Sequence, residues 1–168
     1  MTNLTEKIDQ GGERKLSIKE KLADTFGNVT YSLVVGGTLD YASGLNPAGI
    51  ITSRAYATAV NSATGALYGM WRNFMFELTK TNDKSKGVRK YLTDLLAFNT
   101  FQVPIYATAL SVASLVSEGH VNLEKVEKGV TYLAAISPFV GPTTGWYMDK
   151  CRKFIGVKSA PEKAGEVQ

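Results

Sequence analysis

The segment LLAFNTFQVPIYATALSVASLVS, residues 95–117, decides the fold. Its 23 consecutive residues include no Asp, Glu, Lys, Arg or His. At 1.5 Å per residue, a helix of this length extends about 34 Å, which is enough to cross a bilayer hydrocarbon core of about 30 Å. The sequence therefore predicts a transmembrane helix here.

Three further charge-free windows accompany this segment in the 168-residue chain. They cover residues 25–39, 55–71 and 129–148, and the charged residues lie between and outside them. The overall figures of 44% hydrophobic and 20% charged residues, with a mean hydropathy of −0.07, hide this segregation. Four regular windows favour an all-α integral membrane protein with four transmembrane helices over a soluble helical bundle.

The windows also predict how the chain is divided. We expect helices over about 24–39 and 53–76, a third that contains 95–117, and a fourth that ends near 154. The expected parts are a cytoplasmic tail (1–21), a four-helix transmembrane domain (22–157) and a disordered cytoplasmic tail (158–168).

The basic residues are distributed unequally between the two sides of this arrangement. The N-terminal segment, the segment between the second and third helices, and the C-terminal segment hold five, six and five of the nineteen Lys and Arg residues. Only Arg54, Lys125 and Lys128 lie on the other side. Because basic residues are enriched in cytoplasmic loops, both termini are predicted to be cytoplasmic.

Short internal matches favour a tandem repeat of two helices. Asp24 and Asp94 are each followed, six and seven residues later, by a threonine and an aromatic residue. The second and fourth windows end in GALYGMWR (65–72) and GPTTGWYMD (141–149), each a Gly-x-x-x-Gly followed by an aromatic and then a charged residue. Repeats of this kind occur in transporters, and chance similarity is the alternative.

No catalytic, metal-binding or cofactor-binding motif is present, so we expect no enzyme activity and assign no cofactor or metal. The single histidine, His120, has no nucleophile pattern beside it, and the single cysteine, Cys151, has no partner for an internal disulfide. The pI is near 9.1, but no basic helix carries interleaved aromatic residues, so a nucleic-acid partner is not expected.

Polar side chains recur along one face of the predicted helices. In the second expected helix this face runs from Arg54 through Asn61 to Arg72, and in the third it includes Gln102 and Tyr106. Such faces contact other helices or a water-filled path rather than lipid. Both possibilities remain open for Asn61 and Gln102, whereas the Gly-x-x-x-Gly pairs favour helix packing.

Four charged residues fall at the predicted cytoplasmic ends of the helices. Asp24 and Asp94 are expected to begin helices, where a carboxylate satisfies free N–H groups. Asp149 lies near a helix C-terminus, where the helix dipole disfavours a carboxylate, so it requires Arg72 or Arg152 as a partner. The cluster suits either an ion-pair lock or recognition of an amino-acid zwitterion.

Two further features leave alternatives open. Pro104, Pro138 and Pro142 interrupt the third and fourth helices, and each leaves a backbone carbonyl without its donor. The result is either a simple kink or a broken helix of the kind found in transporters. On the outer side, Asp40 and Arg54 flank one turn and are expected to pair.

Five segments together resemble the L-alanine exporter (AlaE) family: ADTFGNVTYSLVV (23–35), SRAYATAVN (53–61), GALYGMWRN (65–73), DLLAFNTFQVPIYATAL (94–110) and WYMDKCRKFIGV (146–157). The resemblance covers about residues 22–157. It implies a small bacterial inner-membrane protein with four helices that exports L-alanine by using the proton motive force. The polar positions shared with the family are Asp24, Ser53, Arg54, Asn61, Arg72, Asp94, Gln102 and Asp149. The chain departs from the family pattern at Asn73, where an acid is expected, and at Gly36-Gly37.

We therefore expect a multi-pass inner-membrane protein that exports L-alanine or a similar small neutral amino acid, coupled to protons and assembled as a homodimer or larger oligomer through glycine-rich faces. Candidate substrate-binding or proton-coupling residues are Asp24, Arg54, Asn61, Arg72, Asp94, Gln102 and Asp149. The aspartates are candidates for proton coupling or ammonium binding, and Arg72 for the substrate carboxylate. The alternative is a non-transporting membrane subunit or assembly scaffold with the same fold, which would bury its charges as fixed ion pairs.

Overall fold

The computed structural model describes residues 17–42, 47–118, 120–121 and 123–167, and every regular element in these ranges is helical. The elements are α2 (Ile18–Tyr31), a π-helical turn η1 (Ser32–Gly36), α3 (Gly37–Ala42), α4 (Pro47–Leu78), α5 (Gly87–Glu118), α6 (Leu123–Phe154) and α7 (Ala160–Val167). The all-helical part of the predicted fold class is confirmed.

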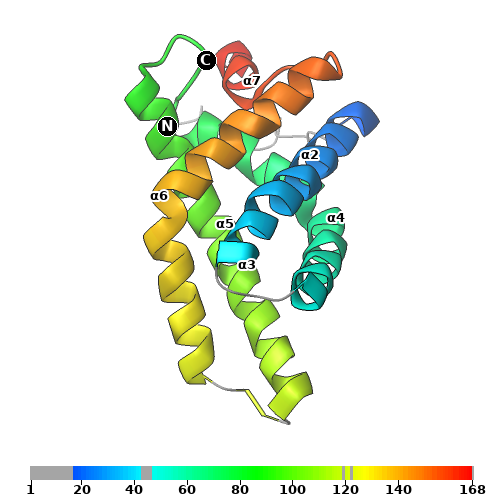
Figure 1. Cartoon of the computed structure of the whole chain (residues 1–168). Helices are drawn as coiled ribbons and strands as arrows, with labels where there is room; N and C mark the ends of the chain where they lie inside the picture. The colour runs from blue at the N-terminus through cyan, green and yellow to red at the C-terminus, as the bar shows by residue number, and fades with distance from the viewer. Residues whose placement is uncertain (1–16, 43–46, 119, 122, 168) are drawn as a thin grey trace, which may run out of the picture.

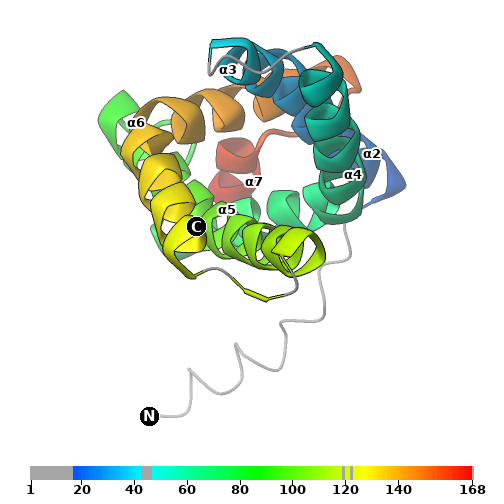
Figure 2. The same cartoon turned by 60° about the horizontal axis from the view of Figure 1, so that its bottom comes forward.

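The long helices form a ring around a common axis. Helix α2 packs on α4 and α6, and α5 packs on the same two helices, so each long helix touches its neighbours along the chain and the last touches the first. Figures 1 and 2 show this ring, with α7 across one end. The start of α2, the turn between α4 and α5, and the end of α6 also lie at that end (Figure 1), as in successive antiparallel helices.

Helix α2 begins earlier than predicted because Ser17 caps it. The Ser17 Oγ accepts from the Glu20 N–H (3.3 Å), and the Glu20 carboxylate accepts from the Ser17 N–H (2.7 Å), which is a capping box. Asp24 therefore lies inside α2, as Asp94 lies inside α5. The prediction that these two aspartates begin helices is wrong, and their carboxylates are left for side-chain partners.

The helix that starts with α2 widens into the π-helical turn η1 before it continues as α3. Arg54 of α4 lies against this turn, where its Nη1 donates to the Ser32 carbonyl (2.8 Å), and a side chain at Gly36 would occupy the space of its guanidinium. The predicted partner of Arg54, Asp40, has a side chain outside the part that the structure describes. Arg54 thus fixes the π-helical turn to α4.

The prolines of α6 do not leave open backbone groups. Pro142 removes the donor of the Pro138 carbonyl, which instead accepts from the Tyr91 hydroxyl of α5 (2.8 Å). Pro138 likewise removes the donor of the Ala134 carbonyl, and the Ser137 hydroxyl donates to it (2.8 Å). At both positions the structure favours a packed kink over a carbonyl available to a ligand.

Charged side chains are buried inside the ring, and large apolar side chains are exposed on its outside. Asp24, Arg72 and Arg152 are fully buried, whereas Phe139 and Phe154 are 79% and 90% exposed.

Across the described residues, no helix has a stretch long and apolar enough to cross a membrane.

The tail after α6 differs from the prediction of disorder, because residues 160–167 form α7. Its apolar face consists of Ala160 and Ala164, which pack on Phe76 of α4. Lys163 pairs with Glu20 of α2. Pro161 is compatible with this helix since proline is tolerated in the first turn, where the N–H has no helical partner.

A carboxylate at Ala164 should detach α7 from the ring. Ala164 is 1% exposed, so Ala164→Glu would bury an unpaired charge, while Val167→Glu places the same group at a position that is 47% exposed. We expect amide hydrogen exchange in residues 160–167 to accelerate at least tenfold in Ala164→Glu and to stay unchanged in Val167→Glu. Equal protection in both variants would contradict the packing of Ala164 on Phe76.

Candidate functional site

Two buried arginines lie at the end of the ring that α7 covers. Arg72 of α4 and Arg152 of α6 both have no exposed surface. A buried guanidinium requires counter-charge and partners for its N–H groups. Each arginine obtains them from helices other than its own, and we call the resulting set Asp24, Arg72, Asn73, Asp94, Asp149 and Arg152 the arginine network.

Arg72 holds two carboxylates at once. Its Nε donates to Asp94 of α5 (2.6 Å), and its Nη1 and Nη2 donate to the two oxygens of Asp149 on α6 (2.6 and 2.7 Å). The Nη2 also reaches the second oxygen of Asp94 (3.4 Å), and the guanidinium carbon lies 4.9 Å from the centre of the Phe76 ring. One cation therefore joins three helices, which confirms Arg72 as a partner of Asp149.

Arg152 forms the second half of the network. Its Nε and Nη2 donate to the two oxygens of Asp24 on α2 (2.6 and 2.8 Å). Its Nη1 donates to the Asn73 side-chain oxygen of α4 (2.7 Å), and Nη2 reaches the Gly69 carbonyl (3.3 Å). Arg152 thus joins α6 to α2 and α4.

Glycines make the space in which the aspartates lie. A Cβ at Gly69 of α4 would overlap the Asp24 carboxylate, and a Cβ at Gly145 of α6 would overlap that of Asp94. Gly65 and Gly141, the other halves of the Gly-x-x-x-Gly pairs, contact α2 and α5. The predicted packing role of these pairs is confirmed within the chain, and the faces expected to join copies in an oligomer are occupied internally.

The same arrangement occurs in each pair of helices. In α2 and α4, an aspartate of the first helix faces the second glycine of the motif on the second helix, and α5 and α6 repeat this geometry. Four residues after the second glycine of each motif stand Asn73 and Asp149, each bound to the arginine of the other pair. This correspondence supports the proposed tandem repeat.

The structure brings most of the predicted site residues to one axis. Asp24, Asp94, Asp149 and Arg72 meet in the arginine network, while Asn61 and Gln102 lie beyond it and Arg54 lies at η1. Sequence reasoning had named Arg152 only as an alternative partner of Asp149. Two features of the sequence could have identified Arg152 as a site residue. It lies about one helical turn after Asp149, and Asn73 stands where an acid is expected.

A central cavity of about 180 Å³ lies next to the arginine network. Its polar lining includes Asn28, Asn61, Gln102 and Thr144, and its apolar lining includes Leu133 and Ile136. The Asn28 Nδ2 donates to the Asn61 Oδ1 across α2 and α4 (3.4 Å). Asn61 and Gln102, for which the sequence left packing and path open, thus face a cavity.

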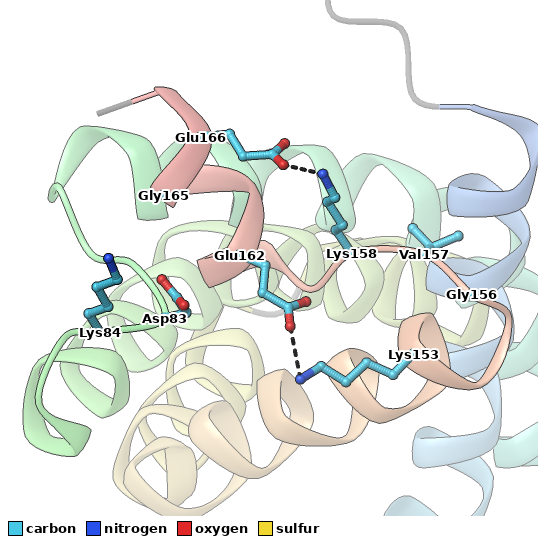
Figure 3. Close-up of a pocket in the computed structure, with 9 residues that line it drawn as sticks. All are labelled: Asp83, Lys84, Lys153, Gly156, Val157, Lys158, Glu162, Gly165 and Glu166. Carbon is cyan, nitrogen blue, oxygen red and sulfur yellow. Dashed lines mark hydrogen bonds and ion pairs between the residues drawn. The ribbon is translucent and has the colours of Figure 1, made fainter.

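A second, larger pocket of about 660 Å³ lies outside the ring, between α7, the end of α6 and the turn before α5 (Figure 3). Its charged residues are three lysines (Lys84, Lys153, Lys158) and three acids (Asp83, Glu162, Glu166). Lys153 pairs with Glu162 (3.1 Å) and Lys158 with Glu166, so these charges serve to hold α7. Among the described residues, no three His, Cys, Asp or Glu side chains are arranged to hold a metal ion.

Filling the space of a motif glycine should break the network. Gly69→Ala must displace Asp24 from Arg152, and separating a buried ion pair costs about 3–5 kcal/mol. Gly87→Ala meets nothing within 4 Å, and we expect its effect on the free energy of unfolding to stay within about 1 kcal/mol. Denaturant unfolding of both purified variants measures the difference; equal stability would refute the close approach at Gly69.

The pKa of Glu162 reports on the attachment of α7. The hydroxyl and N–H of Ser159 both donate to its Oε2 (2.6 and 2.8 Å), and with Lys153 nearby they lower its pKa from 4.5 to about 2. A lowered pKa means that the carboxylate stabilises the folded state above pH 4.5, and that this contribution is lost as the pH falls toward 2. We expect Ser159→Ala to raise the pKa toward 4.5 in an NMR carboxyl titration; an unchanged pKa would contradict the capping geometry.

Comparison with known proteins identifies the family. A family model described as "L-alanine exporter" (AlaE) matches residues 13–158. A protein named L-alanine exporter AlaE from Escherichia fergusonii is 32% identical over 143 residues, which cover 84% of this chain and 88% of that protein. Proteins of the same name from Cronobacter sakazakii and Escherichia coli K12 are 29% identical over 144 residues and 30% identical over 141 residues. These matches cover 85% and 83% of this chain, and 87% and 90% of the two relatives.

No solved structure matches the chain. The family match spans most of the sequence, including the helices that supply every residue of the arginine network. The chain therefore belongs to the AlaE family.

Proposed function

We propose that this protein is a secondary transporter that exports L-alanine or a similar small neutral amino acid across the inner membrane, with protons as the coupling ion. The observation that carries the proposal is a buried ion-pair network one helical turn from a polar cavity on the axis of a four-helix ring. Membership of a family named for L-alanine export supports the choice of substrate.

The distribution of polarity supports a membrane location. Charged groups are buried at the axis, and large apolar side chains such as Phe139, Trp146 and Phe154 are exposed around the outside. Helices α4, α5 and α6 have 32 residues each, or about 48 Å, so their polar ends can extend past a hydrocarbon core of about 30 Å. Together with the sixteen basic residues on one side, this supports a multi-pass protein with both termini in the cytoplasm.

In this proposal the arginine network closes the cytoplasmic end of the transport path. Arg72 joins α4 to α5 and α6, and Arg152 joins α6 to α2 and α4, so the helices cannot separate while both sets of ion pairs are intact. Opening requires that these pairs weaken. Binding of a proton to one carboxylate removes its charge and with it part of the attraction to the arginine.

The charge balance indicates where that proton binds. Arg152 faces one carboxylate, Asp24, and the neutral Asn73, so this group is already balanced. Arg72 faces both Asp94 and Asp149 and keeps an excess of one negative charge. A proton on Asp94 or Asp149 neutralises the excess, whereas a proton on Asp24 would leave Arg152 buried without counter-charge.

The decisive experiment is counterflow of labelled L-alanine in liposomes that contain the purified protein, with and without a pH gradient. In Asp94→Asn we expect counterflow to persist and the response to the pH gradient to fall at least tenfold, because Asn keeps the shape and cannot carry the proton. Asp83→Asn, in the exposed turn before α5, is the matched control. Full gradient response in Asp94→Asn would remove that aspartate from the coupling role.

One observation favours the alternative of a membrane scaffold. Both arginines are fully buried and bound in ion pairs, which is the arrangement expected of a non-transporting subunit. A transporter forms the same pairs in the state in which that end is closed. Absence of counterflow with alanine, glycine and serine, in protein shown to be folded, would select the scaffold.

A further inference from the structure

We propose that the central cavity is the binding site of the amino-acid substrate, with side-chain amides for its charged groups and an aliphatic wall that limits the size of its side chain. This inference rests on the proposed transport function and adds the site and the selectivity to it.

The cavity lies in line with the arginine network. Asn28 follows Asp24 by four residues on α2, Phe98 follows Asp94 by four on α5, and Thr144 precedes Asp149 by five on α6. One helical turn therefore separates the cavity from the network on each of these helices. A molecule in the cavity lies next to the ion pairs that close this end of the ring.

A thin layer of side chains lies at this end of the cavity. Tyr68, Phe98 and Met148 form a buried apolar cluster, and Phe98 also lines the cavity. The Tyr68 hydroxyl is buried and has no hydrogen-bond partner among the described residues. Buried hydroxyls without a partner are rare in folded proteins, and this one lies in the layer beside Phe98 rather than in the cavity lining itself.

The polar lining suits a molecule with both a cation and an anion. An amide side chain has two N–H donors for a carboxylate and a carbonyl oxygen for an ammonium group. Within the described residues the Gln102 amide has no hydrogen-bond partner, and Asn28 and Asn61 share a single bond of 3.4 Å. None of the described residues lining the cavity is charged, which favours a zwitterion over a ligand with net charge.

The size of the cavity selects a small side chain. The cavity has a volume of about 180 Å³. This lies below the roughly 300–1,000 Å³ of typical ligand pockets. Leu133, Ile136 and Val140 of α6 supply an apolar wall, so a methyl side chain fits and a large or charged side chain does not.

The π-helical turn supports the assignment independently. Ser32, Val35 and Gly36 of η1 all line the cavity. Single π-helical turns weaken the regular hydrogen-bond pattern of a helix and occur frequently at functional sites. Arg54 holds the turn in place through the Ser32 carbonyl, so the wall opposite the arginine network is also fixed by an arginine.

Substrate selectivity provides the first test. It is measured as the ratio of two counterflow rates in one sample, so it does not depend on protein yield. Ile136→Ala enlarges the cavity, and we expect it to raise the ratio of valine to alanine counterflow at least tenfold, since one or more methylene groups in an apolar pocket are typically worth 10–200-fold. Phe139→Ala on the same helix is the matched control because Phe139 is 79% exposed; its ratio should equal that of the wild type.

The polar lining is tested by equilibrium binding of labelled L-alanine. Gln102→Ala should weaken binding at least tenfold, while Thr108→Ala, at an exposed position of the same helix, should leave it unchanged. If the wild type transports alanine but Ile136→Ala and Gln102→Ala behave like their controls, the cavity is not the site and the transport function stands. If the wild type neither binds nor exchanges alanine, glycine or serine, the transport function itself fails.

Discussion

The fold depends on the cost of burying two guanidinium groups at the axis of a helical ring. Arg72 and Arg152 have no exposed surface, and each draws its counter-charge from the other pair of helices. Because separation would leave a buried charge without a partner, the pairs α2–α4 and α5–α6 are held together as one unit. The glycines of the two Gly-x-x-x-Gly motifs serve the same end, since they let the aspartates reach the axis.

The two halves of the network are related in geometry but differ in charge. At corresponding positions after the motif glycines, α6 carries Asp149 and α4 carries Asn73. The group around Arg72 therefore has one negative charge in excess, and the group around Arg152 has none. A repeat with equal halves would offer two equivalent proton sites. The asparagine leaves the negative excess on one arginine only, so a single proton neutralises the whole network.

Much of the fold could be predicted from the distribution of charge along the sequence, because each charge-free window lies within one of the helical segments that form the ring. The windows 55–71 and 129–148 lie within α4 and α6, and Asn61 and Gln102 were recognised as polar residues on helix faces. The role of Asp24 and Asp94 was misjudged because a charge beside an apolar window is typical of a helix end, whereas α2 is capped by Ser17 and α5 begins at Gly87. The helix at residues 160–167 was missed because its stability comes from burial against Phe76, a contact with no local signal.

The arginine network and the central cavity together distinguish between a scaffold and a transporter. A scaffold gains from ion pairs that satisfy every group, and the arginine network meets that requirement. A scaffold gains nothing from a Gln102 amide without a hydrogen-bond partner among the described residues, facing a cavity that packing would otherwise fill. The same holds for the buried Tyr68 hydroxyl, which has no partner there either and belongs to the apolar cluster of Phe98. Polar groups without hydrogen-bond partners are expected where a protein binds a ligand. The polar cavity therefore favours the proposed transport function over a scaffold, and the proposal interprets the arginine network as the closed end of the path.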